Sequence, residues 1–236
     1  MSKTNLEDIK QNSQGLYGFL AADLTTAEPF LSEAGKQISK FHGIYQQHDR
    51  EVRKRDLRDE HYSFMVRTKV PGGQLTAVQY LVHDRLADKY GNGSLRLTTR
   101  QTIQFHGIIK GDLRRHIREL NAELVTTLGA CGDIVRNVMA CPAPTADPRR
   151  QQVQIFAHEL SRVLTPQTQA YHQIWLEGEQ LINENLFPIA PEEPLYGPTY
   201  LPRKFKIGVA FEGDNCVDVF TQDVGLVALF GEQDEL

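Results

Sequence analysis

Residues 94–107 combine two contrasting faces within one short stretch. In an extended strand, successive side chains point to opposite sides. One side would be apolar and suited to burial, and it carries Leu95, Leu97, Ile103 and Phe105. The other side would carry only polar or cationic groups: Arg96, Thr98, Arg100, Thr102, Gln104 and His106. The pattern predicts a half-buried pair of strands whose polar face contains no acid.

A polar face with a single charge sign restricts what the strands can contact. A solvated strand face normally mixes acids and bases, whereas guanidinium groups without acids match carboxylates in a bidentate way. Two interpretations follow from the pattern alone. The arginines either make an exposed edge strand soluble, or they hold a large polyanion against the sheet.

Four further stretches accompany this one in the order of the chain. They are residues 40–47 (Lys-Phe-His-Gly-Ile-Tyr-Gln-Gln), 65–73 (Met-Val-Arg-Thr-Lys-Val-Pro-Gly-Gly), 129–139 (Gly-Ala-Cys-Gly-Asp-Ile-Val-Arg-Asn-Val-Met) and 201–206 (Leu-Pro-Arg-Lys-Phe-Lys). Together with residues 94–107 they resemble the sulfite reductase hemoprotein family, the assimilatory enzymes that use sirohaem and an iron–sulfur cluster. Ferredoxin-linked nitrite reductases are sister enzymes in this family.

The resemblance implies an anion-binding set of four cations. Reduction of sulfite to sulfide takes six electrons and several protons at an electron-rich haem, so a cationic pocket has to offset charge repulsion. The family's anion-binding positions fall on Arg67, Arg136, Lys204 and Lys206. Arginine suits the oxygens of the anion, and lysine suits proton donation. For Arg67 the alternative is a structural ion pair with an acid elsewhere in the fold.

The resemblance also implies contacts to sirohaem, whose ring carries many carboxylates. We expect the polar strand face to bind several of them, with the loop residue next to Arg136 adding a further contact. The predicted cofactor-binding residues are Arg96, Arg100, Gln104, His106 and Asn137. His42, Tyr45 and Gln47 extend this set, unless they only form ordinary loop hydrogen bonds.

The three cysteines, Cys131, Cys141 and Cys216, do not match the paired cysteines that bind the family's 4Fe-4S cluster. We interpret them as structural thiols and predict no metal ligand in this chain. The cluster ligands are expected in a C-terminal part that this sequence does not contain. The chain is therefore predicted to be the N-terminal part of the enzyme, inactive as this fragment alone and dependent on the remaining C-terminal part.

The order of apolar patterns predicts an α+β fold: a ferredoxin-like half-domain followed by the start of a mixed α/β sirohaem-binding domain. We place an N-terminal extension and connector at residues 1–60, the ferredoxin-like half-domain at 61–130, and the first part of the sirohaem and 4Fe-4S domain at 131–236. Apolar residues at helical spacing run from Val78 to Ala87 and predict one helix. A second such set runs from Leu113 to Leu128.

The remainder of the second domain is predicted from its prolines and apolar runs. After Pro144 the pattern is mainly helical to about residue 185, and a proline-rich loop covers 186–202. Strands are expected at 205–211, 216–220 and 224–230.

Composition excludes several classes of protein. The net charge of −4 argues against nucleic-acid binding, for which a basic domain is typical. Polar residues open the chain, so no signal peptide is predicted, and no apolar run approaches the ~18 residues of a membrane helix. Unpaired cysteines fit a reducing, cytoplasmic location.

Three functions remain in competition. Sulfite reduction leads, and nitrite reduction with the same cofactors is the closest alternative; Lys206 favours sulfite, because nitrite reductases of this family typically carry Asn there. The third is a non-catalytic module that binds a tetrapyrrole or another polyanion, if the chain is complete as given. The expected electron donor is ferredoxin, which the stretches at 90–92 and 129–133 favour, or a flavoprotein reductase.

Overall fold

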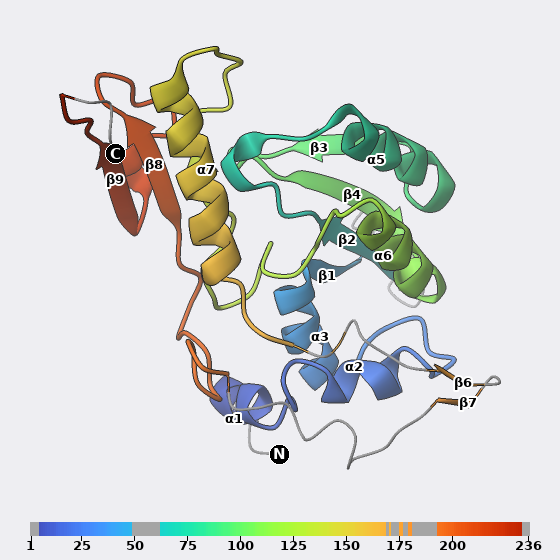
Figure 1. Ribbon diagram of the computed structural model, residues 1–236. Helices are drawn as coiled ribbons and strands as arrows, with labels where there is room; N and C mark the ends of the chain where they lie inside the picture. Colours follow the sequence, from blue (N-terminus) through green and yellow to red (C-terminus); the bar gives the residue numbers. More distant parts are fainter. Residues whose placement is uncertain are drawn as a thin grey trace.

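The computed structural model describes residues 5–48, 62–168, 170, 175–176, 179–180 and 193–232 (Figure 1). Three short helices open this part of the chain: α1 (Leu6–Gln11), α2 (Gly18–Asp23) and α3 (Glu33–Ser39). A 3₁₀ turn, η1 (Lys40–His42), leads into the first strand. No helix of the described residues has the length and apolar character needed to cross a membrane.

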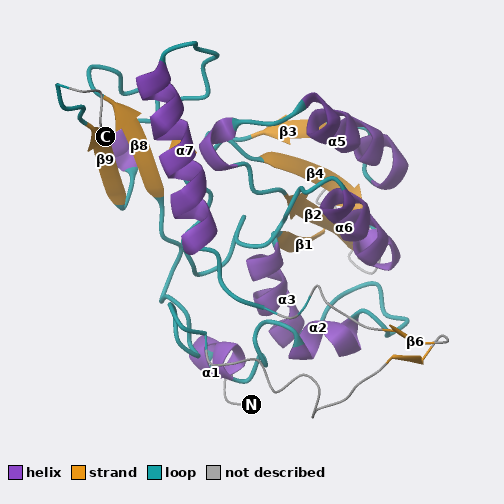
Figure 2. Cartoon of the chain, viewed as in Figure 1, coloured by secondary structure: helices purple, strands orange, loops and turns teal. Residues whose placement is uncertain are grey.

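The first sheet has four antiparallel strands in the order β1-β2-β4-β3. Their bounds are Ile44–His48 for β1, Tyr62–Arg67 for β2, Leu95–Leu97 for β3 and Ile103–Ile108 for β4. Helices α5 (Ala77–Tyr90) and α6 (Leu113–Ala122) pack beside this sheet (Figure 2). The 3₁₀ turns η2 (Pro71–Gly73) and η3 (Lys110–Asp112) complete the connections. The buried core between these layers includes Phe64, Val66, Leu86, Phe105 and Leu120.

The order β2-α5-β3-β4-α6 agrees with the predicted ferredoxin-like pattern. Helix α5 begins at a capping box, in which Thr76 Oγ1 accepts from Gln79 N at 3.1 Å and Gln79 Oε1 accepts from Thr76 N at 3.1 Å. The predicted stripe on α5 was partly wrong, because Val78 and Leu81 are exposed. Val82 and Leu86 do face the core, and His83 takes a buried position beside them.

Helix α6 ends at Ala122, six residues before the predicted end at Leu128. Leu124 has a positive φ of 58° and is 87% exposed, so it lies outside the apolar stripe. The residues that follow, Val125, Thr126 and Thr127, are β-branched and poor at continuing a helix. Their backbone instead joins the sheet region, where Lys69 N donates to Thr126 O at 2.8 Å.

The second sheet is parallel, with the order β5-β8-β9. Its strands are β5 (Met139–Ala140), β8 (Ile207–Phe211) and β9 (Val224–Ala228), and helix α7 (Pro148–Val163) packs against it (Figure 1). Both sheets with their helices confirm the predicted α+β class. Residues 49–61, which include most of the predicted connector, lie outside the described residues.

Two predictions for the second half of the chain were wrong. The helix predicted to reach residue 185 ends at Val163, shortly before Pro166, and residues Trp175–Leu176 (β6) pair with Glu179–Gln180 (β7). The strand predicted at 216–220 is replaced by a 3₁₀ turn, η4 (Val219–Thr221). Asp218 adopts a positive φ of 50° before that turn, and Val219 N donates to the Asn215 side chain at 2.8 Å.

Candidate functional site: an arginine cluster on the first sheet

Three neighbouring strands place polar side chains in one row. Arg67 on β2 is paired with Gln104 on β4, and Gln104 is paired in turn with Arg96 on β3. The adjacent residues Val66 and Phe105 are fully buried on the opposite face. The alternation predicted for β4 is therefore present. Leu97 departs from it, because it ends β3 and is 80% exposed.

Gln104 connects the first arginine with a histidine. With its amide oxygen turned toward β2, Gln104 accepts from Arg67 Nε at 3.1 Å and also from Arg67 Nη2. Its amide nitrogen then donates to His106 Nε2 at 3.1 Å, and His106 Nδ1 lies 3.2 Å from Gln47 Oε1. Burial, with Arg96 and Arg67 nearby, lowers the pKa of His106. The neutral form is therefore favoured beside these cations.

A tight turn between β3 and β4 brings a third arginine to the same region. Thr98 N donates to Thr102 O at 3.0 Å, and the two hydroxyls lie 2.6 Å apart. Within this turn, Arg100 Nη1 donates to Asn137 O at 3.1 Å and Nη2 donates to Gln222 Oε1. Arg100 therefore joins the first sheet to the connection between η4 and β9.

The fourth arginine comes from the loop that precedes β5. Arg136 Nε donates to Gly132 O at 2.8 Å. Burial lowers the pKa of Arg100 to about 10, and the charges of Arg136 and Arg67 act in the same direction, against an opposing contribution from Asp223. Arg100 is therefore partly buried among charges of its own sign.

We call Arg67, Arg96, Arg100 and Arg136 the arginine cluster. None of the four forms an ion pair with an acid of the described part of the chain. The structural ion pair considered for Arg67 is therefore not found among these residues. The cluster presents hydrogen-bond donors and positive charge, which suits an anionic ligand.

Tyr45 and Cys131 lie beside the cluster. Burial raises the pKa of Tyr45, and its neighbours are Cys131, Arg136 and Arg67. Burial also raises the pKa of the Cys131 thiol, whereas Arg67 and Arg136 act against this shift. Both side chains are therefore protonated at neutral pH, so they leave the positive charge of the cluster intact.

The two predicted lysines approach from the segment before β8. Phe205 forms a parallel bridge with Val135, and Arg136 N donates to Phe205 O at 2.8 Å, so this segment lies next to Arg136. Lys206 Nζ donates to Thr221 O at 2.7 Å. Lys204 is exposed and has no hydrogen bond or ion pair within the described residues.

Asn137 is fully buried and its amide contacts the backbone. Its Oδ1 accepts from Val70 N at 2.9 Å, and its Nδ2 donates to Val70 O at 2.7 Å and to Arg100 O at 2.9 Å. The amide therefore holds the backbone of the Arg100 turn against the loop of Arg136. Its predicted contact with a cofactor stays a prediction. The observed bonds indicate that it positions the arginines.

Sequence reasoning missed two residues that support the cluster. Gln222 accepts from Arg100, and Asp223 Oδ2 accepts from Lys206 N at 2.8 Å. Neither residue belongs to a motif or to a polar pattern. Only the parallel pairing of β8 with β9 brings this segment to the arginines.

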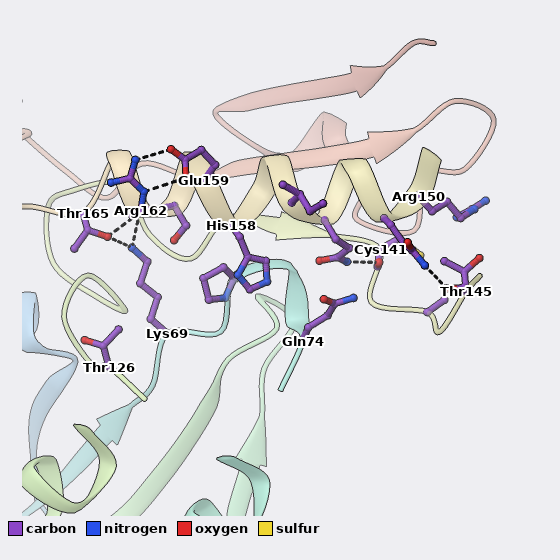
Figure 3. Close-up of a pocket in the computed structure, with 16 residues that line it drawn as sticks. Lys69, Gln74, Thr126, Cys141, Thr145, Arg150, His158, Glu159, Arg162 and Thr165 are labelled. Atoms are coloured by element: carbon purple, nitrogen blue, oxygen red, sulfur yellow. Dashed lines mark hydrogen bonds and ion pairs between the residues drawn. The ribbon is translucent and has the colours of Figure 1, made fainter. Parts of the chain in front are cut away.

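A cavity of about 870 Å³ lies apart from the cluster, between η2 and helix α7 (Figure 3). Lys69 lies at one end of it, where Nζ donates to Thr165 Oγ1 at 2.7 Å and to Ser161 O at 3.3 Å. Cys141 and Arg150 lie at the other end (Figure 3). None of the predicted anion- or cofactor-binding residues lines this cavity. We assign the candidate site to the arginine cluster, because four cations lie there and none of them forms an ion pair with an acid of the described residues.

Comparison with protein families gives two matches. Residues 55–123 match the nitrite/sulfite reductase ferredoxin-like half domain, and residues 157–236 match the nitrite and sulphite reductase 4Fe-4S domain. The chain belongs to the nitrite and sulfite reductase family. The resemblance predicted from the sequence motifs is therefore confirmed.

Curated relatives carry sulfite reductase names. The chain is 46% identical over 236 residues to the sulfite reductase [NADPH] hemoprotein beta-component of Shouchella clausii, covering 97% of this chain and 40% of that protein. It is 42% identical over 247 residues to the sulfite reductase [ferredoxin] of Synechococcus elongatus, covering 99% of this chain and 39% of that protein. The chain thus spans about 40% of the length of these relatives.

Solved structures support the fold. The NirA protein of Mycobacterium tuberculosis matches with a TM-score of 0.61 at 16% identity, covering 98% of this chain and 37% of NirA. Dissimilatory sulfite reductase I matches with a TM-score of 0.53 at 14% identity, covering 98% of this chain and 52% of that chain.

Proposed function

We propose that this chain supplies the anion-binding and sirohaem-binding surface of an assimilatory sulfite reductase. The observation that carries the proposal is the arginine cluster, whose members come from β2, β3, the turn before β4 and the loop before β5, and form no ion pair with an acid of the described residues. The sulfite reductase names of relatives at more than 40% identity support sulfite over nitrite as the substrate.

The donor set of the cluster fits the proposed cofactor. N–H groups for carboxylates around the edge of a flat ring come from Arg96 and Gln104, which are paired across β3 and β4, and from Arg100 in the turn between these strands. Bound sirohaem would supply the redox centre for the electrons. Arg67 and Arg136 would hold oxygens of the substrate anion, and Lys204 and Lys206 would add positive charge and donate protons.

The residues of this chain cannot bind the 4Fe-4S cofactor by themselves. A 4Fe-4S cluster takes four thiolate ligands, and the chain contains three cysteines. Cys131 is buried beside Arg67 and Arg136, away from Cys141 and Cys216. We therefore assign the cysteine ligands of the 4Fe-4S cofactor to a part of the enzyme outside this sequence. The electron donor, ferredoxin or a flavoprotein reductase, would also act on the complete enzyme.

The experiment joins this chain to the remaining C-terminal part of the Shouchella clausii relative. We expect the fusion to produce sulfide from sulfite with a reduced viologen as electron donor, and the 236-residue chain alone to produce none. Arg136→Gln in the fusion should lower sulfide production at least 100-fold while the sirohaem absorbance remains.

Two outcomes would contradict the proposal. Sustained sulfide production by the chain alone would show that it does not need the remaining part. Unchanged activity of the Arg136→Gln fusion would show that the cluster does not bind the substrate. Arg118→Gln, on an exposed position of helix α6, is the control for loss of one positive charge.

A further inference from the structure

Two cysteines and an acid meet where β5 and β8 end. Cys141 follows β5 directly, and Asp214 and Cys216 follow β8. Phe211 and Asp214 form an antiparallel bridge that folds the chain back at this end. One ligand atom from each of the three residues lies within 4.8 Å of the other two. This group contains none of the four arginines of the cluster, and it follows β8, whereas the segment that contacts Arg136 precedes β8.

The spacing of these atoms is close to that of ligands around one metal ion. Two thiolates bound tetrahedrally to zinc, each at about 2.3 Å, are separated by roughly 3.8 Å. A disulfide would need the sulfurs to close to about 2 Å. We propose that Cys141, Cys216 and Asp214 bind one zinc-class divalent ion through two thiolates and a carboxylate, with water at the fourth position.

The surroundings of Asp214 are arranged for this role. Its Oδ2 accepts from Arg150 Nη1 at 2.8 Å, and its Oδ1 accepts from Cys216 N at 3.1 Å. The Arg150 guanidinium lies 4.5 Å above the ring of Phe211, which fixes its position. Hydrogen bonds to a ligating carboxylate orient it toward a metal ion.

The charges also balance. A divalent ion with two thiolates and one carboxylate carries a net charge of about −1, and the adjacent guanidinium of Arg150 neutralises it. Thiolate sulfur selects zinc over magnesium or calcium, which prefer oxygen ligands. Cys216 is exposed and Cys141 is half-buried beside the cavity of Figure 3, so an ion can enter from solvent.

Binding must release protons. Burial raises the pKa of Cys216 to about 12, with Cys141 and Asp214 adding to the shift. Without metal this thiol is therefore protonated at neutral pH. Because zinc binds the thiolate, each ion that binds would release the proton of Cys216 to the buffer.

The test uses the reduced, metal-free 236-residue chain with cobalt(II) as a spectroscopic probe and zinc as competitor. We expect one equivalent of cobalt to produce thiolate-to-metal absorption, and zinc to displace it. Cys216→Ser should roughly halve that absorption and weaken zinc binding at least 100-fold. Asp214→Asn should keep the thiolate absorption and weaken binding about tenfold. The number of protons released per zinc should be about one smaller in Cys216→Ser than in the wild type.

Cys131→Ala is the matched control, because Cys131 is buried at the arginine cluster; it should bind zinc as the wild type does. Circular dichroism checks that each variant is folded, and exposure of Cys216 makes serine compatible with the fold there. Equal zinc affinity of the wild type and Cys216→Ser would overturn the proposal. Disulfide formation between Cys141 and Cys216 that saturating zinc does not slow would also overturn it.

Discussion

Arg67 and Gln104 face each other across β2 and β4, and the Gln104 amide oxygen accepts from Arg67 Nε at 3.1 Å. The amide fixes the guanidinium without neutralising its charge. An acid in the same position would hold Arg67 equally well, but it would cancel the charge available to a ligand. This difference between orientation and neutralisation can be measured.

Gln104→Glu should therefore weaken anion binding while leaving the fold intact. The probe is uroporphyrin, a porphyrin with carboxylates around its ring, and the measurement is quenching of its fluorescence by the 236-residue chain. We expect affinity to fall roughly tenfold, which corresponds to about 1.4 kcal/mol. Gln104→Met, which removes the hydrogen bonds but adds no charge, should lose less. Equal affinity of the glutamate variant and the wild type would show that Arg67 does not contact the probe.

Asn137→Leu should destabilise the protein by about 3 kcal/mol. The substitution leaves the buried N–H of Val70 and the carbonyl oxygens of Val70 and Arg100 without their amide partner. The free energy of unfolding, measured in urea, checks the prediction. Asn121→Leu, on an exposed turn of α6, is the control and should change stability by less than about 0.5 kcal/mol. A loss at position 137 no larger than the control would contradict the assigned positioning role.

Lys10→Met should also destabilise the fold. The Lys10 ammonium is buried, lies 2.7 Å from Asp133 Oδ2 and donates to Leu201 O at 2.8 Å. Removing it leaves a carboxylate without its cation, which typically costs about 3 kcal/mol. Lys36→Met breaks an exposed pair with Glu33 and should cost less than about 0.5 kcal/mol. Similar urea midpoints for the two variants would show that α1 does not depend on this ion pair.

The stability of the protein should fall in mild acid because of His116. The imidazole is buried, neither ring nitrogen has a hydrogen-bond partner within the described residues, and burial lowers its pKa to about 4. An unfolded histidine titrates near 6.5, so between about pH 6.5 and 4 the unfolded state binds a proton that the folded state does not. The free energy of unfolding is therefore unaffected by His116 above about pH 6.5, and it decreases as the pH falls from 6.5 toward 4.

His116→Phe isolates this contribution. The His116 ring packs edge-on against the Phe105 ring, with 4.4 Å between the ring centroids, so a phenylalanine ring suits this position. Relative to the wild type, the variant should gain about 2 kcal/mol more at pH 5 than at pH 7.5, by urea unfolding. His42, with a pKa also lowered to about 4 by burial, remains in both proteins, so its acid sensitivity cancels in the comparison. A pH-independent difference would mean that His116 does not titrate in this window.

The sequence predicts local features of this fold well. Phe105 and Gln104 show why: alternation along β4 depends only on neighbouring residues and on one buried face. Long-range relationships were harder. Leu124 fits the apolar stripe of α6 but lies outside the helix, since the backbone of Thr126 is bonded to Lys69 instead. Gln222 reaches Arg100 only because β8 and β9 are parallel.

For the candidate site, too, the residues could be predicted from sequence motifs, whereas their long-range contacts could not. Arg67, Arg100 and Arg136 all belong to stretches that can be recognised in the sequence, and the structure adds only that Arg100 connects the two halves of the site through Asn137 and Gln222. Asn137 was also noted in a motif, but its hydrogen bonds to Val70 and Arg100 could not be read from spacing. Which partners a buried amide satisfies depends on tertiary contacts.

Lys206→Asn should shift substrate preference in the fusion with the Shouchella clausii C-terminal part. Lys206 lies next to the segment that contacts Arg136, and its ammonium is held by Thr221 O at 2.7 Å. Loss of one positive charge should cost the more highly charged sulfite more than nitrite. We expect the ratio of kcat/KM for sulfite to that for nitrite to fall three- to tenfold, or about 1 kcal/mol. Lys204→Asn removes the same charge at an exposed position two residues away. It is the control: a similar change in the ratio for Lys204→Asn would indicate a general effect of charge and not a specific contact of Lys206. An equal loss for both anions in Lys206→Asn would show that this lysine does not select the substrate.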